Sequence, residues 1–252
     1  MTAPILLTGG TGTLGRRVLP CLRAAGATVR VLSRHEHEPT DGVEYVLGDL
    51  ATGRGVAAAA AGVRTILHCA GTAKGDDHKA RALVEAATDA EHVVFISVVG
   101  ADQDSFGYFA AKSAAERIIA ESGTPWSTLR ATQFYDSILA VVRQLAKLPV
   151  IPVPAGFRFQ PVDTDEVAAR LAGLALGAPA GLVPDLAGPT VHELADLVRD
   201  YLAVTHRRRP ILPVRLPGKA ARAFRAGVNL APDQPLGRRS WAMFLADRSS
   251  RC

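Results

Sequence analysis

The chain has 252 residues, of which 48% are hydrophobic and 21% are charged. This length suits a single α/β domain, and the composition excludes an intrinsically disordered chain because it can bury a sizeable core. No apolar stretch approaches the roughly 20 residues that cross a bilayer, and the first residues lack the basic segment of a secretion signal. We therefore expect a cytoplasmic protein with no membrane partner.

The net charge of +5 is unevenly distributed along the chain. From Arg207 onward there are 11 Lys and Arg residues and two acidic residues, whereas the preceding part has 18 basic and 22 acidic residues. A basic tail can bind nucleic acid. Here, however, arginines such as Arg222 and Arg225 alternate with apolar residues, as on the solvated face of a helix. We expect no nucleic-acid partner.

The three cysteines predict neither a disulfide framework nor a metal site. Cys21, Cys69 and Cys252 are odd in number and widely spaced, without a Cys-x-x-Cys pair or a Cys/His cluster. We therefore expect buried free thiols and no metal.

Short β-type runs alternate with helical stretches through the first half of the chain. This alternation predicts an α/β fold, a Rossmann-type doubly wound parallel sheet with helices on both faces. Gly26 and Gly123 stand where helices are expected to end. The expected strands are 4–8, 28–33, 43–47, 65–69, 92–97 and 126–130, and the expected helices are 13–25, 77–90 and 108–122.

A glycine-rich loop follows the first expected strand and opens the first helix. Gly9 and Gly12 would let the backbone turn tightly and approach a pyrophosphate, while Gly15 would let helix and strand pack closely. The positive end of the helix dipole favours phosphates at the same place. The sequence therefore predicts a dinucleotide site at Gly9, Thr11, Gly12, Thr13, Leu14 and Gly15.

The end of the second expected strand bears on the choice of nicotinamide cofactor. An acidic residue there would bind the ribose 2′-hydroxyl, whereas an arginine can pair with a 2′-phosphate. Ser33 and Arg34 occupy this position and favour NADP(H). Glu36 and Glu38 follow closely and could supply an acidic contact, so NAD(H) stays open.

Other residues at the expected carboxyl edge of the sheet are candidates for cofactor contacts. Asp49 and Leu50 follow the third strand and would lie near the adenine, although Asp49 could equally form a turn or cap a helix. Ala70 and Gly71 follow the fourth strand, where small residues let a cofactor lie close. His68 is expected to pack near the sheet and to take no part in catalysis.

Beyond residue 130, prolines break the chain into short pieces, and helices are expected near 163–176 and 190–204. We expect one NAD(P)-binding domain over residues 1–252. Its dinucleotide-binding core would be 1–132, and 133–252 would form a small C-terminal substrate-covering lobe with basic helices. Apolar residues of this lobe, Phe134, Tyr135, Phe157 and Phe159, indicate an uncharged ligand.

A tyrosine and a lysine, Tyr108 and Lys112, are spaced to share one helix face, and Ser97 ends the fifth expected strand. An ammonium beside a phenol lowers the phenol pKa, so Tyr108 could transfer a proton while Ser97 binds the same substrate oxygen. The alternative is an ordinary amphipathic pair, with the phenol half-buried and the ammonium in water. A loop with Asp102 and Asp104 separates Ser97 from Tyr108 and could hold them apart.

Four motifs occur in this order within about the first 170 residues: the glycine loop, Ser97 at the end of a strand, the Tyr108/Lys112 pair and Leu129-Arg130-Ala131-Thr132-Gln133-Phe134. Together they resemble the NmrA-like, NAD(P)H-binding group of atypical short-chain dehydrogenases/reductases. The resemblance implies that Lys112 also holds the nicotinamide ribose and that Gln133 and Phe134 contact substrate. The resemblance is also compatible with a homodimer.

The function expected from the sequence is an NADP(H)-dependent oxidoreductase that acts on a small carbonyl or quinone-like substrate. The main alternative is a non-catalytic NAD(P)-binding redox sensor or regulatory protein, because many similar proteins bind the dinucleotide without known turnover. An isomerase or epimerase that retains its cofactor also stays open.

Overall fold

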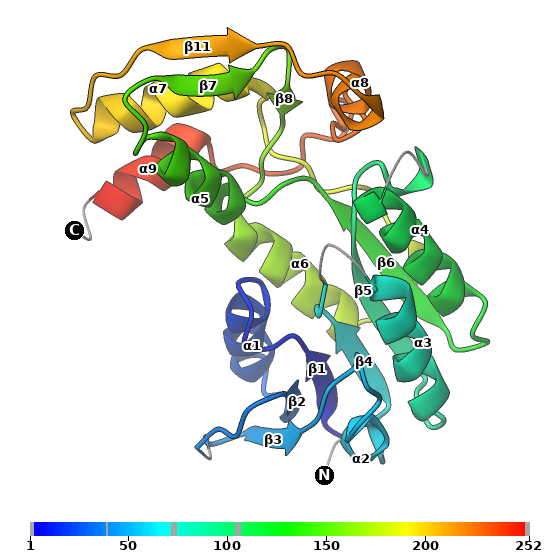
Figure 1. Ribbon diagram of the computed structural model, residues 1–252. Coiled ribbons are helices and arrows are strands. Elements are labelled where there is room, and N and C mark those ends of the chain that lie inside the picture. Colours follow the sequence, from blue (N-terminus) through cyan, green and yellow to red (C-terminus); the bar gives the residue numbers. More distant parts are fainter. Residues whose placement is uncertain (1–2, 39, 72–74, 104–106, 250–252) are drawn as a thin grey trace. The chain divides into compact units, whose positions relative to one another are not determined.

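The computed structural model describes residues 3–38, 40–71, 75–103 and 107–249, and no helix within these ranges is long and apolar enough to cross a membrane. The chain forms two compact units (Figure 1). Unit 1 comprises Met1–Ser97, Gly107–Arg130 and Asp165–Pro184. Unit 2 comprises Val98–Phe106, Ala131–Thr164 and Asp185–Cys252. Cys252 and Asp104, named above, lie outside the described residues.

Unit 1 contains a seven-stranded sheet with the order β3-β2-β1-β4-β5-β6-β9, which confirms the expected Rossmann-type fold. The pairs β2–β3, β1–β2, β1–β4, β4–β5 and β6–β9 are parallel. The chain moves outward from β1 to β3 and then returns to the other side of β1, so strand order reverses between β1 and β4. The strands are β1 (Ile5–Thr8), β2 (Val29–Ser33), β3 (Val43–Leu47), β4 (Thr65–His68), β5 (His92–Val98), β6 (Trp126–Ala131) and β9 (Gly181–Leu182).

Helices cover both faces of this sheet (Figure 1). On one face, strand residues Leu6, Ile66 and Phe95 form a buried core with the helices α2 (Val56–Ala60), α3 (Asp76–Ala86) and α4 (Gly107–Ala120). The other unit 1 helices are α1 (Gly15–Ala24) and α6 (Thr164–Leu176), and Arg17 of α1 pairs with Asp165 of α6 at 2.6 Å. Burying this apolar surface drives the assembly of the layers.

Both glycines expected at helix ends have a left-handed backbone, with φ of +80° at Gly26 and +81° at Gly123. Gly26 donates its N–H to the carbonyl of Arg23 at 2.9 Å, which satisfies an acceptor in the last turn of α1. These glycines therefore end helices as predicted, because a side chain disfavours this conformation.

Unit 2 has its own aromatic core. Tyr135 is fully buried, stacks on Phe244 and donates its hydroxyl hydrogen to the carbonyl of Arg239 at 2.8 Å. Tyr135 was one of the apolar lobe residues taken above to indicate an uncharged ligand, but its ring and hydroxyl serve the core. The elements are η1 (Ala101–Gln103), α5 (Tyr135–Leu145), β7 (Ile151–Pro154), β8 (Arg158–Phe159), β10 (His192–Glu193), α7 (Leu194–Val204), β11 (Ile211–Val214), α8 (Lys219–Ala226) and α9 (Trp241–Ser249).

Candidate functional site

The glycine loop joins β1 to α1 in a conformation that side chains would obstruct. Gly9 has a φ of +71°, and a Cβ there would lie 2.7 Å from the backbone nitrogen of Ala70, after β4. A Cβ on Gly15 would lie 2.2 Å from the Gly9 carbonyl oxygen. The Gly12 N–H also donates to that oxygen at 2.9 Å. The glycines thus allow the loop to fold tightly against the end of β4.

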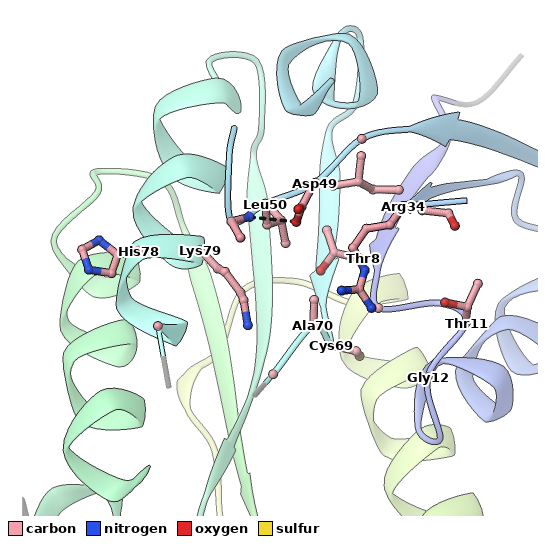
Figure 2. A pocket seen from close by; sticks show the side chains of 17 residues that line it. Thr8, Thr11, Gly12, Arg34, Asp49, Leu50, Cys69, Ala70, His78 and Lys79 are labelled. Atoms are coloured by element: carbon pink, nitrogen blue, oxygen red, sulfur yellow. Dashed lines mark hydrogen bonds between the residues drawn. The ribbon is translucent and has the colours of Figure 1, made fainter. Parts of the chain in front are cut away.

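A cavity of about 560 Å³ lies in unit 1 beside this loop (Figure 2). Its lining comes from the carboxyl ends of four parallel strands, at the point where strand order reverses. This is where open α/β sheets bind their ligands. The lining residues are Thr8, Gly9, Thr11, Gly12, Leu32, Ser33, Arg34, Gly48, Asp49, Leu50, Ala51, Cys69, Ala70, Gly71, Gly75, His78 and Lys79.

Most of the predicted cofactor residues meet in this cavity. Its lining includes nine of them: Gly9, Thr11, Gly12, Ser33, Arg34, Asp49, Leu50, Ala70 and Gly71. Four others, Thr13, Leu14, Gly15 and Lys112, are not part of the lining. Leu14 and Gly15 are buried at the start of α1, so in this structure they support the loop.

Sequence reasoning missed the contribution of α3 to the cavity. In Figure 2 the side chains of Arg34 and Lys79 extend into the cavity from opposite walls, whereas the ring of His78 points away. Two cations that face one space create a positive potential suited to phosphate. The sequence around Lys79 gave little indication of this role, because a lysine on the first turns of an amphipathic helix ordinarily faces water.

The residues after β2 and β3 form one wall. The Ser33 hydroxyl lies 2.8 Å from Nε2 of His37 and accepts the N–H of His35 at 3.2 Å. The ring of His37 in turn stacks on Tyr45. Asp49 accepts the Ala51 N–H at 3.0 Å through Oδ1, which is the turn role left open above. The wall is therefore held by local hydrogen bonds.

A buried ionic network lies at the edge of the cavity, next to Gly71. The side chain of Lys112 is only 4% exposed, and its Nζ lies 3.1 Å from Oδ2 of Asp76. Nζ also donates to the Ile96 carbonyl at 3.1 Å, and Lys79 Nζ lies 3.3 Å from Asp76 Oδ1. A Cβ on Gly71 would lie 3.0 Å from Lys112 Nζ. Burial lowers the pKa of Lys112, and the charge of Asp76 opposes this shift.

The predicted catalytic residues are only partly brought together. Ser97 Oγ is buried in β5 without a hydrogen-bond partner among the described residues. Lys112 donates a hydrogen bond to the carbonyl of Ile96, the residue before Ser97. Tyr108 is 39% exposed, and within the described ranges no hydrogen bond joins it to Ser97 or Lys112. The expected lowering of the Tyr108 pKa by Lys112 is not observed. Burial, and next the charge of Asp76, raise this pKa.

Two further titratable groups line or adjoin the cavity without being reactive. His68 is buried, its Nδ1 lies 2.6 Å from the Thr8 hydroxyl, and burial lowers its pKa to about 3. Burial raises the pKa of Cys69 to about 12. His68 is therefore a packed, neutral imidazole, as expected, and Cys69 is a protonated thiol. As whole residues, Cys21 and Cys69 are less buried than the sequence led us to expect, although the Cys69 thiol itself is buried.

The predicted substrate residues lie in unit 2. Gln133 accepts a hydrogen bond from the buried Asn229 at 3.4 Å. Phe134 precedes α5 with an extended backbone and pairs with Val162. Both side chains are partly exposed. Their role toward a substrate stays a prediction.

The cavity fits a dinucleotide in size and chemistry. Its volume falls within the range of cofactor sites, and the loop has no Cβ at Gly9 or Gly12 that would hold a pyrophosphate away. The cationic side chains of Arg34 and Lys79 are part of its lining.

Known proteins share this fold and parts of this sequence. A ceramide reductase of Caulobacter vibrioides is 29% identical over 216 residues, which cover 78% of this chain and 65% of that protein. A (4-alkanoyl-5-oxo-2,5-dihydrofuran-3-yl)methyl phosphate reductase of Streptomyces griseus subsp. griseus is 29% identical over 141 residues, 54% of this chain and 50% of that protein. The chain thus spans between half and two thirds of these relatives.

The fold also matches solved structures closely. The crystal structure of an NADPH-dependent quinone oxidoreductase from Escherichia coli in complex with NADPH superposes with a TM-score of 0.83, at 17% identity. The match covers 97% of this chain and 99% of that one. At the level of sequence, residues 9–147, more than half of the chain, match the NAD(P)H-binding family model. The protein therefore belongs to the NAD(P)H-binding family.

Proposed function

We propose that the protein is an NADP(H)-dependent oxidoreductase that reduces a small carbonyl or quinone-like substrate. The observation that carries this proposal is the cavity beside the glycine loop, which Arg34 and Lys79 enter from opposite walls. Reductases among the relatives and an NADPH-dependent quinone oxidoreductase among the structural matches support the reaction class. Membership of the NAD(P)H-binding family supports the cofactor class.

The preference for NADP(H) over NAD(H) rests on Arg34. A guanidinium can donate two parallel hydrogen bonds to a phosphate, and such charge-assisted bonds are stronger than neutral ones. No carboxylate follows β2 directly, because Ser33 and Arg34 occupy the end of that strand. A 2′-phosphate would therefore find a cation where an NAD-specific site has an acid.

The bound dinucleotide would supply a hydride to the substrate carbon. The substrate oxygen then needs a proton, which the Tyr108 hydroxyl would donate, because a phenol is protonated at neutral pH and burial raises its pKa further. An ammonium has three N–H donors. Lys112 Nζ donates to the Ile96 carbonyl and lies 3.1 Å from Asp76 Oδ2, and a further N–H would bind a ribose hydroxyl beside Gly71. Ser97 Oγ is buried without a hydrogen-bond partner among the described residues, and its proposed role is to bind the substrate oxygen.

A non-catalytic redox sensor is the second candidate, and one observation favours it. No hydrogen bond within the described ranges links Tyr108 to Ser97 or Lys112. A sensor needs the dinucleotide site and no proton donor. The two candidates therefore share the cavity and differ in what Tyr108 does.

Fluorescence titration with NADPH and NADH tests the cofactor assignment. Arg34→Ala should weaken NADPH binding about 10- to 100-fold, the range for loss of hydrogen bonds to a charged group, and should leave NADH binding almost unchanged. Arg81→Ala, which removes an exposed cation from α3, is the matched control and should change neither. Failure of the wild-type protein to bind either dinucleotide would refute the proposal.

Tyr108→Phe separates the enzyme from the sensor. In an enzyme the variant should bind NADPH normally and lose turnover of quinone or carbonyl substrates, since its hydroxyl acts only in the reaction. In a sensor the wild-type protein should turn over none of these substrates, and it should bind the oxidised and reduced dinucleotides with different affinities.

A further inference from the structure

The basic tail noted in the sequence is one part of a larger surface of unit 2. Residues 137–162 and 201–232 contain ten Lys and Arg residues and no Asp or Glu. These two segments supply β7, β11 and α8 as well as most of α5. The proposed function assigns no role to this separation of charge.

The fold brings the two acid-free segments together. β7 and β11 pair in parallel, with Leu212 opposite Pro152, and the Ile151 N–H donates to the Pro210 carbonyl at 2.9 Å. Parallel strands begin at the same edge of a sheet. The residues before β7 and the arginines Arg207, Arg208 and Arg209 before β11 therefore meet at one edge.

One face of this two-stranded sheet is covered and the other is not. Ile151 and Val153 point into the unit 2 core with α5 and α7. Leu212 is 55% exposed, and Val150 and Leu148, which precede β7, are 45% and 41% exposed. Aliphatic side chains are thus presented beside the arginine run.

The arginines also surround a hollow of about 460 Å³. Leu202, Ala203 and Ile211 form its apolar part, and its polar lining consists of Arg199, Arg207, Arg208 and Arg209. Arg199 pairs with Asp196, whereas Arg207 and Arg208 have no acidic partner in the part of the chain that the structure describes. The hollow therefore combines cations, which can bind an anion, with apolar lining residues.

We propose that this surface docks the protein peripherally on a bilayer of anionic lipids. Anionic headgroups complement a cluster of arginines, and exposed aliphatic side chains enter the boundary between headgroups and acyl chains. Single-stranded nucleic acid would instead favour aromatic platforms for its bases, and the exposed side chains here are aliphatic. The expectation of no membrane partner rested on the lack of a spanning segment and does not address such contact.

Vesicle co-sedimentation tests this inference. The wild-type protein should bind vesicles of equal parts phosphatidylcholine and phosphatidylglycerol and should not bind phosphatidylcholine alone. Each basic residue near an anionic surface contributes about fivefold to the partition coefficient, so changing Arg207, Arg208 and Arg209 together to Gln should reduce it on the order of 100-fold. Replacing Val150 and Leu212 by Thr, which keeps β propensity, should also weaken binding.

A control triple variant removes the same charge elsewhere, at the exposed arginines Arg64, Arg81 and Arg170 of unit 1. It should bind vesicles nearly as the wild type does. An equal loss in both triple variants would overturn the proposal, as would an absence of wild-type binding. If the protein bound single- or double-stranded DNA more tightly than the anionic vesicles, and the Thr variant kept that binding, the membrane proposal would be overturned in favour of nucleic acid. Circular dichroism and NADPH titration verify that each variant is folded.

Discussion

Replacing Asp76 by Asn tests whether the buried network at the cavity edge sustains the charge of Lys112. The substitution keeps the shape of the side chain and removes its negative charge. Asp76 is 1% exposed and lies near two ammonium groups, Lys112 at 3.1 Å and Lys79 at 3.3 Å. In the variant the buried Lys112 would keep the Ile96 carbonyl as a neutral acceptor and would lose its counter-charge.

The distances set the size of the effect. At 3.1 Å and an effective dielectric constant of about 20, the attraction between Asp76 and Lys112 is about 5 kcal/mol before the cost of desolvation. Removing one partner of a buried pair typically costs about 3 to 5 kcal/mol. Lys112 can also escape by losing its proton, which limits the cost at neutral pH to about 5 kcal/mol. We expect Asp76→Asn to destabilise the fold by about 3 kcal/mol.

Urea unfolding at neutral pH and at about pH 9 measures both the loss and its origin. Burial lowers the pKa of Lys112 in the folded protein, and without Asp76 this pKa falls further below its ordinary value of 10.5. The unfolded chain then binds more protons than the folded one between these two pKa values, so the stability of the variant rises with pH. The gap between variant and wild type should therefore narrow at about pH 9.

Asp77→Asn is the matched control, because it removes the same charge from the next residue of α3, where the side chain is 37% exposed. Its effect should stay within about 0.5 kcal/mol. If the two variants had equal stability and equal pH dependence, the network would not hold the charge of Lys112. NADPH affinity should also fall in Asp76→Asn and not in Asp77→Asn.

Two other perturbations test the walls of the cavity. Gly9→Ala should abolish dinucleotide binding and lower the melting temperature, because its Cβ would lie 2.7 Å from the Ala70 nitrogen at a φ of +71°; unchanged binding would contradict the tight loop. His68 has a folded pKa of about 3, so the unfolded chain takes up its proton first as the pH falls below 6.5. His68→Asn should therefore remove a stability loss of up to about 1.4 kcal/mol per pH unit in that window, which urea titrations at several pH values would reveal.

The sheet and its glycine loop could be predicted from sequence because their signals are local. The strand 43–47 was predicted with the observed bounds, and the other five strands agree within one residue at each end. Each is a short apolar run bounded by residues that end strands. The seventh strand, β9, was not predicted. Its two residues show no strand pattern in the sequence and form a strand only by pairing with Ser127 and Thr128.

Long-range pairing also explains the differences in unit 2. The helix predicted over 190–204 begins at Leu194, because His192 and Glu193 pair with β8 instead. Their partners are more than 30 residues away in the chain, so no helix-start signal near residue 190 could reveal them. The sequence identified Tyr135 only as an apolar residue of the lobe, and the fold shows that Trp241 and Phe244 of α9 pack against its ring.

The burial of Lys112 and its pairing with Asp76 could not be predicted from the sequence. A lysine four residues after a tyrosine predicts a shared helix face and nothing about burial. The structure places the partner of Lys112 at the start of another helix, 36 positions earlier. Because Asp76 both opposes the lowering of the Lys112 pKa and raises that of Tyr108, one carboxylate acts on both groups. Asp76 therefore favours the ammonium form of Lys112 and disfavours the phenolate of Tyr108, and neither effect could be predicted from the Tyr108/Lys112 spacing.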